Sequence, residues 1–217
     1  MANLKILLNS IVEEFMSAFL GPIHYWLYNK IELQEELIQN IVEAAEKNNW
    51  CEDLPNEVEK NFGKAETKSL EEIIDQNNIH GWLQSRISHT ESKLAFVVTN
   101  ILRKNSDYIS ELKKTSYSFG ESKAAPGDLT ADAFYKLLND TLIDGMPCDR
   151  VNELVESDEN QTAWRQNLCV HSDYWQNIGL DVSVYYELRH EIIKGMISKS
   201  GLEYIVNEDG LNIIRRK

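Results

Sequence analysis

Two segments of this chain repeat one sequence pattern, and the repeat limits the folds that the chain can adopt. Residues 23–35 and 79–91 both follow the pattern I-H-x-W-L-x-x-[KR]-I-x-x-x-E. Apolar residues continue at helical spacing after each copy, so both segments are predicted to be long amphipathic helices. Two copies of one helical unit usually pack around an approximate two-fold axis. The repeated residues are therefore expected at a shared interface between the two helices.

Length and charge narrow the class of protein further. The chain has 217 residues and a formal net charge of -13. This length suits one hydrophobic core, so we expect a single helical domain over residues 1–217. The negative charge and the absence of a long basic cluster argue against nucleic acid and against an anionic membrane as partners.

The cysteines and the first residues indicate a cellular compartment. The chain has an odd number of cysteines, and they are widely scattered, at Cys51, Cys148 and Cys169. They are therefore expected to form neither a disulfide framework nor a CxxC metal pair. Residues 4–19 are apolar at helical spacing but include Glu13 and Glu14 and lack a basic start, which is typical of a core helix and not of a secretion signal. We therefore expect a cytoplasmic protein.

Helices are expected along most of the chain. Long helices are predicted at 22–47 and 79–105, separated by a polar loop at 48–68 and a capping box at 69–72. The Ser, Gly and Pro content of residues 116–130 indicates an internal linker. Shorter helices are predicted at 131–143, 150–156 and 182–198, and residues 164–175 remain unassigned. A β-hairpin is predicted at 202–216, around Asn207-Glu208-Asp209-Gly210. The predicted fold class is all-α, a multi-helix bundle with two repeated long helices and a short C-terminal hairpin.

The repeated histidines and glutamates are the first candidate site. Helical periodicity places His24, His80, Glu35 and Glu91 at the edge of the buried stripe, where an ionisable group needs a partner. If the helices are antiparallel, His24 faces Glu91 and His80 faces Glu35, which is the arrangement we expect. If they are parallel, His24 meets His80 and Glu35 meets Glu91. The sequence does not decide between the two arrangements, because the connection is long enough for either.

These residues suggest a ligand site between the helices. His and Glu side chains could hold a divalent metal ion, and the neighbouring Trp26, Trp82 and Tyr28 could form the walls of a cavity for a small organic molecule. The simpler interpretation is structural: the polar groups are buried hydrogen-bond partners and the tryptophans fill a core. Under either interpretation Leu27, Leu83, Ile31 and Ile87 are expected inside, with Lys30 and Arg86 pointing outward.

A second group of candidates lies in the C-terminal third. Glu187 and His190 have the Glu-x-x-His spacing by which ferritin-like bundles present two ligands to one metal ion, although only one copy of the motif occurs. The periodicity of their helix places both outside the buried arc, which favours a solvated surface. Cys169 and His171 suggest a thiol nucleophile with a neighbouring base, but residues two apart on a helix point away from one another.

The sequence thus leaves three functional hypotheses. The first is a helical bundle that binds a metal ion or a small organic molecule between the repeated helices, with acid–base or metal-assisted catalysis as the chemistry if it is an enzyme. The second is a non-catalytic interaction or scaffold protein, as a homodimer, in which the same residues only hold helices together. The third is a cysteine hydrolase that uses Cys169. No phosphate-binding loop, nucleophile elbow, zinc-protease motif or calcium loop occurs, which argues against nucleotide-dependent chemistry.

Overall fold

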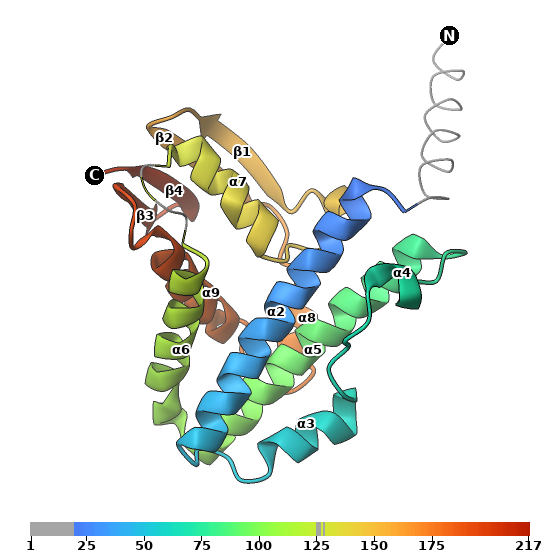
Figure 1. The fold of residues 1–217 in the computed structure, drawn as a ribbon. Coiled ribbons are helices and arrows are strands. Elements are labelled where there is room, and N and C mark those ends of the chain that lie inside the picture. Colours follow the sequence, from blue (N-terminus) through green and yellow to red (C-terminus); the bar gives the residue numbers. More distant parts are fainter. Residues whose placement is uncertain (1–19, 125–126, 128) are drawn as a thin grey trace.

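The computed structural model describes residues 20–124, 127 and 129–217 (Figure 1). The predicted helix at 4–19 and part of the predicted linker lie outside these residues. Within them the chain forms eight α-helices and one antiparallel sheet of four strands. The all-α prediction is therefore wrong, because the hairpin expected at the end of the chain is half of a larger sheet, and the fold is mixed α and β.

The two repeated segments form the longest helices and lie side by side. They are α2 (Pro22–Lys47) and α5 (Ile79–Lys104), which confirms both predicted helices to within one residue. Leu27, Leu83, Ile31 and Ile87 are buried, as predicted. Figure 1 shows α3 (Leu54–Phe62) and α4 (Leu70–Ile73) against one side of this helix pair. The predicted capping box is present at the start of α4, with Ser69 as the N-cap.

A second helix pair packs on the opposite side of α2. The 3-10 turn η1 (Ser106–Tyr108) leads into α6 (Ile109–Ser122), which packs closely on α9 (Ser183–Ile197). The predicted linker at 116–130 is thus wrong in its first half, because residues 116–122 are the last two turns of α6. Leu112, Ser116 and Phe119 of this helix are buried at the usual helical spacing. Its Ser and Gly content therefore serves close packing.

The sheet joins two hairpins that are distant in the sequence. Strands β1 (Asn152–Ser157) and β2 (Gln161–Gln166) form one, and β3 (Leu202–Val206) and β4 (Leu211–Arg216) form the other. The order is β1-β2-β4-β3, so β4 lies in the interior beside β2. The helix predicted at 150–156 is wrong, and the predicted C-terminal hairpin is present. Helix α7 (Ala131–Thr141) contacts β2 and β4, with Tyr135 packed on Trp164.

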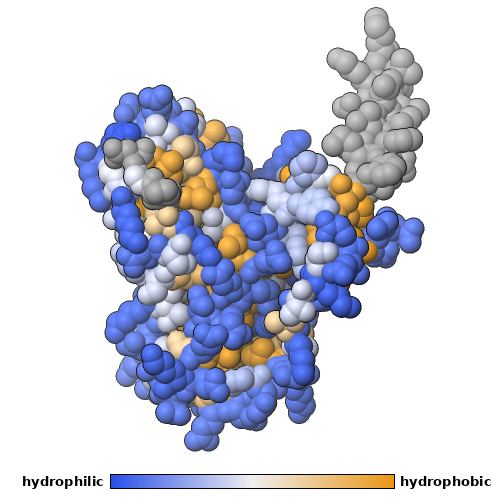
Figure 2. Space-filling view, viewed as in Figure 1, coloured by the Kyte–Doolittle hydropathy of each residue, from blue (hydrophilic) through white to orange (hydrophobic). Residues whose placement is uncertain are grey.

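Two short elements complete the fold and place residues for the site. The 3-10 turn η2 (Pro147–Asp149) follows α7, and α8 (Ser172–Gln176) follows β2 and contacts α5. Trp175 of α8 is fully buried. Hydrophilic residues cover most of the face seen in Figure 2, with hydrophobic residues showing between the elements. No helix in the described ranges is both long and apolar enough to cross a bilayer.

Candidate active site: a cysteine cavity beside a buried charge network

The repeated histidines contact one another and not the glutamates. His24 Nε2 lies 3.2 Å from His80 Nε2. The expected pairs His24–Glu91 and His80–Glu35 are wrong, because α2 and α5 run parallel and bring equivalent positions together. The Gly21 N–H donates to His24 Nδ1 over 2.9 Å, so in the neutral imidazole the proton is on Nε2 and points toward His80. Burial, and then the neighbouring His80, lower the pKa of His24.

The repeated glutamates occupy different environments. Glu35 accepts a hydrogen bond from Lys93 Nζ at 2.6 Å and remains partly exposed. Glu91 is 1% exposed and does not meet Glu35. Its Oε1 accepts from Gln34 Nε2 at 3.0 Å, and its Oε2 lies 2.9 Å from His171 Nδ1. Glu91 was predicted at the edge of the buried stripe with His24 as its partner, whereas it is buried and its partners are Gln34 of α2 and His171 from the C-terminal third of the chain.

The candidate metal ligands do not assemble into a metal centre in the described part of the chain. Glu187 forms an ion pair with Lys113, and the His190 ring lies 5.1 Å from the Tyr204 ring. Residues 20–124, 127 and 129–217 contain no group of three or more His, Cys, Asp and Glu side chains that could hold a metal ion. Neither the His24–His80 pair nor the Glu187–His190 pair therefore gains a third ligand there.

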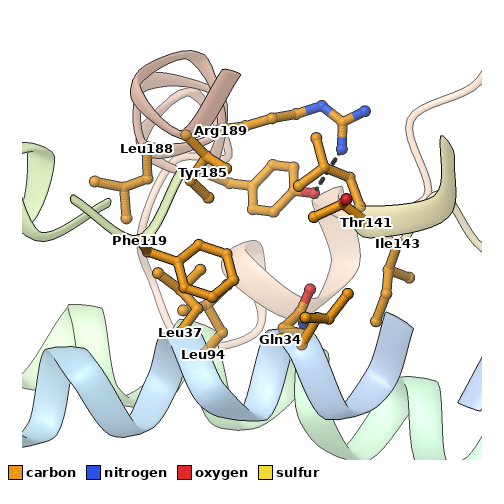
Figure 3. A pocket seen from close by; sticks show the side chains of 12 residues that line it. Gln34, Leu37, Leu94, Phe119, Thr141, Ile143, Tyr185, Leu188 and Arg189 are labelled. Atoms are coloured by element: carbon orange, nitrogen blue, oxygen red, sulfur yellow. Dashed lines mark hydrogen bonds between the residues drawn. The ribbon is translucent and has the colours of Figure 1, made fainter. Parts of the chain in front are cut away.

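The aromatic side chains do not enclose a common cavity between the repeated helices. The Tyr28 and Trp82 rings lie 5.9 Å apart, whereas Trp26 packs against Lys30 on another side of α2. Lys30 is buried, which contradicts its predicted outward orientation. Figure 3 shows Tyr185 of α9 and Phe119 of α6 filling the space above α2. The cavity that remains there has about 20 Å³, which is room for about one water molecule.

Four ionisable side chains form a network in which two are buried and two are partly buried. It links Glu91, His171, Asp144 and Arg189. The His171 imidazole, 0% exposed, lies between the two carboxylates, with Nδ1 on Glu91 and Nε2 3.8 Å from Asp144 Oδ1. Arg189 pairs with Asp144 Oδ2 at 2.9 Å, and the Tyr185 ring stacks on the imidazole with centroids 3.9 Å apart. The network connects α5, α9, the loop after α7 and the residue that precedes α8.

The charges in the network shift the pKa values of His171 and Asp144. Burial alone would lower the pKa of His171, but Glu91 and Asp144 raise it to about 9. Burial alone would raise the pKa of Asp144, but Arg189 and then His171 lower it to about 2. His171 and Arg189 thus converge on Asp144 with the opposite charge, which is the condition under which buried charges are tolerated. The raised pKa and the contact of Nδ1 with Glu91 both argue against His171 as a general base for Cys169.

This network predicts a pH dependence of stability. The pKa of His171 rises from 6.5 to about 9 on folding, so its contribution is complete below pH 6.5 and is lost as the pH rises through 9. Between these limits we expect the free energy of unfolding to fall by up to ~1.4 kcal/mol per pH unit. Urea denaturation at several pH values gives the free energy of unfolding of the wild type and of His171→Gln. The expected effect is the difference between the two proteins in the slope of this free energy against pH. Equal slopes would contradict a charged His171.

Cys169 lies beside this network in an environment that stabilises a thiolate. Its Sγ accepts hydrogen bonds from Ser172 Oγ at 3.0 Å and from Tyr186 OH at 3.1 Å. Partial burial alone would raise the pKa of the thiol. The two hydroxyls and the backbone N–H groups of His171 and Ser172 have the opposite effect, and the net shift of the Cys169 pKa is downward. Gln166 of β2 donates to Tyr186 OH at 2.8 Å, which orients that hydroxyl toward the sulfur.

The thiol opens onto a cavity. The cavity has about 170 Å³ and lies between α5, α8 and the loop after α7. Glu91, Cys169 and His171 belong to its wall, together with Asp149, Asp173 and Tyr174. Cys169 itself is exposed, so a molecule that enters from solvent can reach the sulfur. Glu91 is paired with His171, so Asp149 and Asp173 are the carboxylates that favour an uncharged or cationic ligand in this space.

Sequence reasoning found Glu91, Cys169 and His171 but missed the residues that complete their environment. Asp144 and Arg189 carry no local motif, and they become neighbours only because the loop after α7 packs on α9. The expected pairing of Cys169 with His171 as nucleophile and base does not occur, because the imidazole turns inward to Glu91. A polar residue on an otherwise apolar helix face, as at Glu91, was the one useful indication in the sequence.

Comparison with known proteins adds no further information. No protein-family model, no curated protein and no solved structure matches this chain.

Proposed function

We propose that the protein is a thiol-dependent enzyme that binds a small organic molecule in the cavity at Cys169 and attacks it with the Cys169 sulfur. The observation that carries the proposal is the pair of hydroxyl groups that donate to Sγ, since a cysteine without a functional role does not need two such donors on its sulfur. The thiolate, not the thiol, is the nucleophile. A downward pKa shift therefore increases the reactive fraction at neutral pH.

The side chains near the Cys169 sulfur have different proposed roles in its reaction. Burial raises the pKa of Tyr186, so its hydroxyl keeps its proton and can donate to the sulfur. Ser172 supplies the second hydroxyl. His171 and Glu91 act at a distance, by holding the start of α8 and hence the backbone next to Cys169 in place. A carbonyl or another electrophilic carbon is the group that such a thiolate attacks.

Alkylation of Cys169 tests the proposal. Cys148 is also exposed and shows no comparable donors to its sulfur among the described residues, so it is an internal control. With iodoacetamide at pH 6–7 we expect Cys169 to react about ten-fold faster than Cys148, because a larger fraction of it is thiolate. Peptide mass mapping after timed quenching measures both rates. Equal rates at every pH would contradict the proposal.

Two variants identify the cause of the reactivity. Tyr186→Phe and Ser172→Ala each remove one donor, so we expect Cys169 to be alkylated about three-fold more slowly near pH 6 and at the wild-type rate once the pH exceeds the thiol pKa. Cys148→Ser is the matched control and should leave the rate at Cys169 unchanged. An activity screen with small acyl thioesters, in which Cys169→Ser is inactive, would then identify the reaction.

A further inference from the structure

A second cavity, on the other side of Gly145, contains a buried lysine. It has about 160 Å³, and its wall comes from α2, α7 and residues 144–152. Lys30 and Trp26 of α2 line it, as do Asp144 and Arg150. None of these four residues lines the cavity at Cys169, although Gly145 borders both spaces. The two cavities therefore have different chemistry.

The Lys30 amine has no polar partner among the residues that the structure describes. The side chain is 4% exposed, and Nζ lies 4.2 Å from the centroid of the Trp26 ring, which is a cation–π contact. The indole is itself fixed, since Trp26 Nε1 donates to Asp140 at 2.8 Å. An ammonium group that is buried without a hydrogen-bonded carboxylate is costly, so proteins retain it where the amine is used.

The charges around Lys30 leave its amine partly neutral near physiological pH. Burial is the main cause that lowers the pKa of Lys30 to about 8, while Asp144 raises it and Arg189 lowers it. Asp140 raises it less, and its carboxylate is engaged with Lys136 and Trp26. Asp144 is likewise engaged, by Arg189 and by Asn152 Nδ2 at 3.0 Å. Both of these bonds end on Oδ2, and neither carboxylate forms a hydrogen bond with the ammonium group.

Arg150 supplies a second cation at the same cavity. It is exposed, and within the described ranges it forms no ion pair. Its backbone has a positive φ of 50°, which is an uncommon conformation for a residue other than glycine, asparagine or aspartate. A guanidinium in this position can bind a carboxylate with two parallel hydrogen bonds.

We propose that this cavity is a second small-molecule site, in which Lys30 forms an imine with a small oxo acid whose carboxylate binds Arg150. The neutral amine donates its lone pair to the carbonyl carbon, and proton transfer gives a carbinolamine. The carbinolamine then loses the former carbonyl oxygen as water and leaves a C=N bond between substrate and Nζ. Trp26 and Pro147 provide the apolar wall for the rest of the molecule. The step needs no oxidant or reductant.

Reductive trapping tests this proposal on the wild-type protein. The protein is incubated with pyruvate near neutral pH, the imine is reduced with borohydride, and peptide mass mapping locates the secondary amine. We expect modification at Lys30 at least about ten-fold faster than at Lys64, because an ordinary surface lysine is almost wholly protonated at this pH. Lys64 is a suitable reference, since its side chain is 82% exposed.

Variants and a second probe separate the parts of the proposal. Lys30→Arg keeps the charge and should lose the adduct. Arg150→Gln should reduce labelling by pyruvate about ten-fold while changing labelling by acetaldehyde, which has no carboxylate, less than about two-fold. Cys169→Ser should be labelled like the wild type, so the result is independent of the thiol proposal. Labelling of Lys30 no faster than that of Lys64 would overturn the imine, and equal pyruvate labelling in Arg150→Gln would overturn the oxo acid.

Discussion

Replacing Gly195 with alanine is expected to lower the free energy of unfolding by about 3 kcal/mol or more. Gly195 of α9 packs against α6 so closely that an added Cβ would overlap the carbonyl oxygen of Tyr117. Gly120 of α6 is in the reciprocal position, where a Cβ would overlap the carbonyl oxygen of Ile192. Backbone atoms cannot turn aside as a flexible side chain can. The helices would have to move apart, and the core between them would lose its packing.

Urea denaturation followed by circular dichroism measures this effect for Gly195→Ala and Gly120→Ala. Gly81→Ala is the matched control in α5, because its added Cβ would meet only the side chain of Asn78, which can move. The better helix propensity of alanine, worth ~1 kcal/mol, offsets the loss of that N-cap contact. We therefore expect Gly81→Ala to be close to neutral. A similarly small effect at Gly195 would show that α6 and α9 are not in backbone contact.

Removing the guanidinium of Arg189 is expected to have the largest effect among the charged residues. Arg189→Met fills a similar volume but leaves the largely buried Asp144 carboxylate with His171, Asn152 and the more distant charge of Lys30, which costs ~3–5 kcal/mol. The matched control is Lys136→Met, which removes a cation from an exposed pair with Asp140. Surface pairs contribute ~0–1 kcal/mol, so we expect little change there.

A double variant distinguishes a lost ion pair from lost packing. If the cost arises from an uncompensated carboxylate, the double variant Asp144→Asn/Arg189→Met should lose less free energy of unfolding than the two single variants lose together. We expect a coupling energy of about 1–3 kcal/mol. Strict additivity would mean that Arg189 acts mainly through its apolar stem. Chemical denaturation of the wild type and the three variants in one buffer gives the coupling directly.

The sequence predicted the parts of the fold that local patterns control. The bounds of α2 and α5 follow from uninterrupted apolar spacing, and the β3–β4 hairpin follows from its turn residues. Strand β1 was missed because all its residues except Asn152 are exposed, so it has no alternation of buried and polar side chains to detect. Its partner β2 has three consecutive buried residues, which match neither a helix nor a half-buried strand.

The candidate sites depend on contacts between segments that are distant in the sequence. The pattern placed Glu91 at the edge of a buried stripe, but it could not show that α2 and α5 are parallel or that His171 completes the pair. Lys30 was expected to point outward because the opposite wall of its cavity, residues 144–152, lies far along the chain. The spacing of apolar residues in one helix cannot show that a loop distant in the sequence buries a single polar residue of that helix.

The interior position of β4 has a consequence for synthesis on the ribosome. Strands β1 and β2 emerge first, yet the free edge of β2 has its partner only when residues 211–216 have emerged. Until then a strand that carries Trp164 presents unpaired N–H and C=O groups, and such an edge is open to pairing with other chains. Helix α9 emerges between the two hairpins and can pack on α6 first. The nascent chain would then complete its helices before it completes the sheet, which makes the edge of β2 the segment that a chaperone would have to shield.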